Sequence, residues 1–191
     1  MSLQDRIINH FTDNIQTQQQ AMASLLEVIE FSSQRLVAAL LNDQKILVCG
    51  SGSSALNAQH FSSALLNPFE RERPALPALM LSTDLALLGN TALDDIFAKQ
   101  IRALGNNGDL LMIFSNGDKT ANISKATKAA HDKDMAIIAL TGDNGRAISP
   151  LLNESDIEIR VPSLFNKRIE ETHLLIIHCL VDLVDHQIFG G

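Results

Sequence analysis

The stretch KILVCGSGSSALNAQHF, residues 45–61, combines residue types that could bind a phosphate with one histidine. An apolar run, 46–49, leads into Gly50-Ser51-Gly52-Ser53-Ser54 and then into a helical pattern. Glycines let a ligand approach the backbone, serine hydroxyls donate hydrogen bonds, and a helix N-terminus favours an anion. The spacing matches neither the Gly-Lys-Ser/Thr ending of a nucleotide P-loop nor a dinucleotide-binding GxGxxG. We therefore expect a sugar phosphate rather than a nucleotide.

A second loop with similar chemistry follows the apolar run 109–114. Its candidate binding residues are Ser115, Asn116, Gly117, Lys119 and Thr120, while Asp118 adds an opposing negative charge. In an open parallel sheet, ligands bind at the carboxyl ends of the strands, so both loops would meet at one crevice. Helix capping alone would explain either loop. Two loops on one edge predict a phosphosugar-binding site.

These loops need an α/β framework to position them. Five short apolar runs alternate with helical patterns and are typical of parallel strands covered on both faces; they are 46–49, 76–81, 109–114, 135–140 and 156–161. We expect one domain over 1–191 with a central five-stranded parallel sheet at 44–163. N-terminal helices are expected over 1–43, with a break near Ser32-Ser33, and a long interface helix over 164–191.

The last helix is apolar on most of its circumference, which predicts burial on most sides. In a domain of this size, that indicates a subunit interface in addition to the protein's own core. The remaining polar stripe comprises Glu171, His178, Asp182 and Asp185.

Charge and cysteine content exclude several classes of protein. The net charge is −7, and no Lys/Arg cluster predicts direct nucleic-acid binding. The mixed run Glu70-Arg71-Glu72-Arg73 is expected to be a solvated turn. Cys49 and Cys179 lie in apolar runs and should be reduced core residues. With no secretory signal and no predicted membrane span, we expect a cytoplasmic protein.

Three motifs resemble the sugar isomerase (SIS) family, and within it the phosphoheptose isomerase branch. They are GxGxSxxxAxHF at 50–61, LTGxxG at 140–145 and RIxExH at 168–173. The resemblance implies an SIS-type three-layer sandwich in a homotetramer. It also implies an aldose–ketose isomerisation by a carboxylate and a histidine beside a site often occupied by zinc.

The resemblance carries over to only some of the active-site positions. His60 matches a metal-binding histidine and His178 a catalytic histidine, but Ala64 stands where the isomerases have their glutamate base. Glu170 replaces a glutamine, and Lys167 replaces an aspartate. A metal could be held by His60, Glu170 and His178, though a helix separates the last two by about 12 Å at ~1.5 Å per residue. Sharing between subunits, or a simple pairing of His178 with Asp182, are the alternatives.

The missing base leads us to expect no catalytic residues and no required cofactor. Stretches such as NAQHF at 57–61 and EIR at 158–160 also resemble the DnaA initiator-associating (DiaA-like) group. That resemblance implies a homotetrameric scaffold that binds the replication initiator DnaA. Ile188 and Phe189 would then form a partner anchor, unless they simply pack on the helices. The alternatives are a phosphoheptose isomerase that uses Glu170 and His178, and a phosphosugar sensor.

Overall fold

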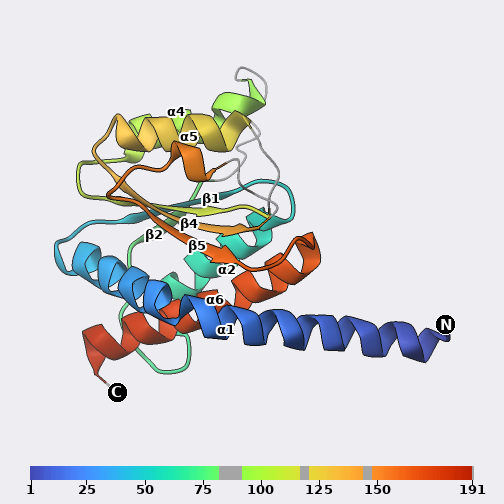
Figure 1. The fold of residues 1–191 in the computed structure, drawn as a ribbon. Coiled ribbons are helices and arrows are strands. Elements are labelled where there is room, and N and C mark those ends of the chain that lie inside the picture. The colour runs from blue at the N-terminus through green and yellow to red at the C-terminus, as the bar shows by residue number, and fades with distance from the viewer. Residues whose placement is uncertain (82–91, 117–120, 144–147, 191) are drawn as a thin grey trace.

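A five-stranded parallel sheet forms the centre of the molecule (Figure 1). The computed structural model describes residues 1–81, 92–116, 121–143 and 148–190. The strand order is β2-β1-β3-β4-β5, and every neighbouring pair is parallel. The strands are β1 (Ile46–Gly50), β2 (Ala78–Met80), β3 (Leu110–Phe114), β4 (Ala136–Gly142) and β5 (Ile157–Val161). Each predicted apolar run overlaps one of these strands, which confirms the expected sheet.

Helices cover both faces of the sheet because both faces are apolar. In β1, Ile46 and Val48 pack into one buried cluster, whereas Leu47 and Cys49 pack into the other. This alternation follows from the two-residue period of a strand. The first cluster lies under α1 (Leu3–Leu41), α2 (Ser54–Leu66) and α6 (Asn166–Phe189); the second lies under α4 (Ile96–Leu104) and α5 (Ala121–His131). Short 3-10 turns occupy Leu93–Asp95 and Ser149–Leu151. The predicted three-layer sandwich is confirmed.

The N-terminal segment is one continuous helix, and the predicted break near Ser32-Ser33 is wrong. The Ser32 hydroxyl donates to the Val28 carbonyl at 2.7 Å, and the Ser33 hydroxyl donates to the Glu30 carbonyl at 2.7 Å. Such bonds to the preceding turn let serine sit inside a helix without interrupting it.

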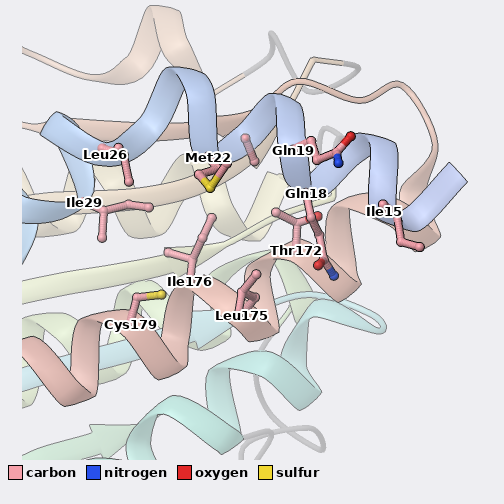
Figure 2. A pocket seen from close by; sticks show the side chains of 11 residues that line it. Ile15, Gln18, Gln19, Met22, Leu26, Ile29, Thr172, Leu175, Ile176 and Cys179 are labelled. Carbon is pink, nitrogen blue, oxygen red and sulfur yellow. The ribbon is translucent and has the colours of Figure 1, made fainter. Parts of the chain in front are cut away.

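The first half of α1 extends beyond the rest of the domain and carries exposed apolar side chains (Figure 1). They are Leu3, Ile7, Ile8, Phe11 and Ile15. The second half packs against α6, and a mainly apolar groove runs between the two helices (Figure 2). Exposed apolar surface of this extent is typical of an interaction face.

Helix α6 is buried on the side that faces the sheet, α1 and α2. By length and mean hydropathy alone it could cross a membrane, but a core helix passes the same test, and α6 packs extensively on α1. Cys179 was expected in the core, and that expectation is wrong: it is exposed and lines the groove with α1 (Figure 2). An all-round apolar helix buries only the faces that neighbouring elements cover, and Cys179 lies on the open one. Cys49 is buried, and burial raises the pKa of its thiol to about 12.

The run Glu70–Arg73 is not wholly a solvated turn, because Arg73 is buried. Its Nε donates to Asp185 of α6 at 2.6 Å, and its other nitrogens donate to the carbonyls of Ala64, Leu65 and Pro74. Asp185 is also buried, although it was expected on a polar stripe. Arg73 thus satisfies the last carbonyls of α2 and joins that helix to α6.

We predict that Asp185→Asn lowers the free energy of unfolding by about 3 kcal/mol, because it leaves the Arg73 charge buried without its partner. Chemical denaturation measures the loss. Asp182→Asn, on the exposed side of the same helix, is the matched control and should change stability by less than about 0.5 kcal/mol. Equal effects of the two substitutions would contradict a structural role for this ion pair.

His173 lies fully buried in α6 beneath the end of β4. Its Nε2 donates to the Thr141 carbonyl at 3.0 Å, while its Nδ1 has no hydrogen-bond partner among the described residues. Burial lowers the pKa of His173 to about 4, outweighing the opposite effect of the Thr141 carbonyl. The folded protein therefore keeps this imidazole neutral.

We predict an acid-dependent loss of stability through His173. The unfolded chain takes up this proton near pH 6.5, whereas the folded chain takes it up near pH 4. Stability is therefore fully present above pH 6.5, and about 3 kcal/mol of it is lost as the pH falls to 4. His173→Gln, which keeps a donor but cannot titrate, should flatten this pH dependence in denaturation experiments. The exposed-histidine control His186→Gln should follow the wild type; identical curves for all three proteins would overturn the assignment.

Candidate functional site

The first loop needs two glycines to connect β1 to α2 tightly. A Cβ on Gly50 would lie 2.6 Å from the Ser54 carbonyl oxygen, so no side chain fits there. Gly52 has a φ of 59°, a conformation that glycine adopts without strain. A cavity of about 340 Å³ lies beside this loop, bordered by Gly50, Ser51, Gly52 and Asn122. That volume is sufficient for a small ligand.

The two loops meet at the carboxyl edge of the sheet. The Asn116 amide donates to the Ser53 hydroxyl at 3.3 Å, and the Ser51 hydroxyl donates to Asn122 at 3.0 Å. Ser54 is buried, and its hydroxyl has no hydrogen-bond partner among the described residues. The predicted residues Gly117, Lys119 and Thr120, together with Asp118, lie outside the described residues, as do Asn144 and Gly145 at the end of the LTGxxG motif.

Glu170 of α6 joins both loops. Its carboxylate accepts hydrogen bonds from the Ser53 hydroxyl and from the Asn116 amide, the latter at 2.7 Å, and pairs with Lys167 at 2.9 Å. Asn57 of α2 donates to the Glu170 carbonyl at 3.0 Å. Burial acts to raise the pKa of Glu170, but hydrogen bonds from Lys167, Ser53 and Asn116 outweigh it and lower that pKa. The site therefore contains an ionised carboxylate at neutral pH.

A pair of histidines lies further along the same two helices. His60 of α2 and His178 of α6 bring their Nε2 atoms to 3.0 Å, with the rings edge to face and Phe69 beside His178. One of these nitrogens must carry a proton for the other to accept. Burial, followed by the charge of His178, lowers the pKa of His60. His178 thus contacts His60, and the alternative of a pairing with Asp182 is wrong.

The three expected metal ligands, His60, Glu170 and His178, do not share one site in the structure. Glu170 bonds to the loops, whereas His60 and His178 contact each other. No cluster of three or more His, Cys, Asp or Glu side chains suited to a metal occurs in the described part of the chain. A catalytic zinc takes three protein ligands, so two imidazoles do not complete a zinc site within one chain.

Ala64 follows His60 by one helical turn and contributes its methyl group to the core. Its carbonyl accepts from Arg73, so the position caps the end of α2. No carboxylate stands there. Sequence reasoning missed Asn57 and Phe69, which touch Glu170 and His178; Asn57 lies one turn before His60, and that spacing could have placed it on the same face.

We predict that His178→Asn raises the pKa of His60, because the substitution removes a neighbouring positive charge. A titration of the histidine ring protons by NMR measures the shift. His186→Asn, near the end of α6, is the control and should leave the His60 titration unchanged. A His60 curve that is the same in both variants would contradict the contact between the two rings.

Comparison with known proteins identifies the class. The model of the SIS domain family matches residues 10–142, and this chain belongs to that family. Its relatives place it in the phosphoheptose isomerase branch. The phosphoheptose isomerases of Methylococcus capsulatus and Chromohalobacter salexigens are 50% and 52% identical, over 100% of this chain and at least 99% of theirs.

A solved structure agrees with these relatives. The phosphoheptose isomerase from Francisella tularensis is 43% identical, with a TM-score of 0.93 over 97% of this chain and 100% of the other. The expectation of a non-catalytic scaffold that binds DnaA is therefore wrong, because proteins alike over the whole length are named isomerases. The missing glutamate at Ala64 misled that interpretation, and the isomerase alternative agrees better with the comparisons.

Proposed function

We propose that this protein is a phosphoheptose isomerase that interconverts sedoheptulose 7-phosphate and the corresponding aldoheptose 7-phosphate. One observation carries the proposal. Helix α6 places an ionised carboxylate, Glu170, against the two phosphate-type loops, and it places His178 against His60 of α2. Full-length similarity to proteins named phosphoheptose isomerase supports the choice of substrate.

In this proposal, the loops at the carboxyl edge of the sheet bind the substrate. The side chains of Ser51, Ser53, Ser115 and Asn116 carry hydroxyl and amide donors suited to phosphate and sugar oxygens. Gly52 leaves open space beside the backbone, where these oxygens can approach.

In this proposal, His60 and His178 transfer the protons. Isomerisation removes a proton from the carbon next to the carbonyl, forms an enediol, and returns a proton to the neighbouring carbon. His60, neutral because its pKa is lowered, accepts the carbon-bound proton. His178 donates a proton to the carbonyl oxygen to give the enediol. His60 then returns its proton to the neighbouring carbon, while His178 takes the proton of the adjacent hydroxyl, so that both histidines recover their starting states. The earlier alternative paired His178 with Glu170, but Glu170 is bonded to the loops instead.

We also propose that copies of this chain assemble into a homotetramer in the cytoplasm. The exposed apolar side chains of α1 and the groove between α1 and α6 support assembly (Figure 2). At the end of α6, Ile188 packs against the core and Phe189 is 40% exposed.

We predict that His178→Asn lowers kcat for sedoheptulose 7-phosphate about 100-fold and changes KM less than about threefold, because it removes a proton donor and no phosphate contact. NMR of the sugar in D₂O measures both turnover and deuterium incorporation at carbon. His131→Asn, a histidine paired with Asp156 at the C-terminal end of α5, is the control. Absence of turnover by the wild type, or full turnover by His178→Asn, would refute this assignment.

A further inference from the structure

In the free protein, the Glu170 carboxylate already accepts hydrogen bonds from donors that the substrate's phosphate would need. The Ser53 hydroxyl and the Asn116 amide, one from each loop, both donate to the same carboxylate oxygen of Glu170. Hydroxyl and amide donors that converge on one oxygen are also the chemistry that a phosphate oxygen requires. The site is thus occupied by a group of the same charge as its proposed ligand.

Glu170 has a second partner, Lys167, which can still pair with its carboxylate when a phosphate takes the Ser53 and Asn116 donors. Its other carboxylate oxygen lies 2.9 Å from the Lys167 ammonium, and the Lys167 side chain is 72% exposed. The lysine is therefore free to follow the carboxylate toward solvent. A Glu170 side chain that stayed in place would instead repel the phosphate, because like charges at short range disfavour each other.

We propose that Glu170 is an internal competitor for the substrate's phosphate. Its carboxylate holds Ser53 and Asn116 in position in the free protein, and the phosphate displaces it toward Lys167 on binding. Glu170 thereby sets the affinity for sugar phosphates, because anions that bind too weakly to displace its carboxylate are excluded. This deepens the proposed function and rests on it only for the identity of the sugar.

Glu170→Gln tests the competition directly. The amide oxygen can still accept from Ser53 and Asn116, but the negative charge is gone. We expect inorganic phosphate to bind about tenfold more tightly to this variant than to the wild type, measured by calorimetry at pH 7 and low salt. Glu171→Gln is the matched control: it changes the net charge equally, yet Glu171 contacts Asn14 and Arg168 rather than the loops. Its phosphate affinity should stay within about twofold of wild type.

Lys167→Met supplies the second test. Removal of the lysine leaves Glu170 without its alternative partner, so phosphate affinity should fall in the wild-type background. In the Glu170→Gln background the same change should have a much smaller effect, because no carboxylate remains to be retained. Equal effects in both backgrounds would show that Lys167 acts on phosphate directly and would overturn the displacement step.

Other outcomes separate this inference from the proposed function. Unchanged or weaker phosphate binding in Glu170→Gln, with circular dichroism showing an intact fold, overturns the competition even if the wild type isomerises sedoheptulose 7-phosphate. Tighter phosphate binding in Glu170→Gln supports the competition even if the wild type shows no turnover. Sedoheptulose without phosphate is the specificity probe: its affinity should not rise in the variant. An equal gain for sedoheptulose and for inorganic phosphate would overturn a role in phosphate selection.

Discussion

A parallel sheet that is apolar on both faces must be covered on both faces, and the rest of this structure depends on that constraint. Because all five strands point the same way, the loops that follow them meet at one edge. Because both faces need cover, α2 and α6 are brought side by side over one of them. The candidate site forms where that edge and that pair of helices meet.

Helix α6 links the stability of the domain to its chemistry. Near the end of the helix, Asp185 accepts a hydrogen bond from the buried Arg73 side chain, and in its first half His173 is kept neutral beneath β4. Glu170 and His178 project from the same helix toward α2. A shift of α6 along α2 would therefore disturb the packing and the site together.

The site differs from the expected isomerase arrangement at the position that matters for proton transfer. Ala64 provides only a methyl group to the core, and Glu170 is engaged by both loops. The histidine pair is the remaining group with a proton to share, and its two nitrogens are close enough to exchange one. The proposed isomerisation therefore assigns proton transfer to the two imidazoles and the control of phosphate binding to the Glu170 carboxylate.

The sequence by itself determined the sheet, the two phosphate-type loops and the family, because short apolar runs and glycine-serine turns are local signals. It did not determine which side chains would meet. Ser53 and Glu170 are separated by 117 residues, and His60 and His178 by 118, so only the packing of α2 against α6 brings each pair into contact. Likewise Arg73 belongs to a charged run that looks solvated, yet the end of α2 and Asp185 together bury it. Cys179 is the converse: an apolar run placed it in the core, but no helix or strand in the described part of the chain covers that face of α6.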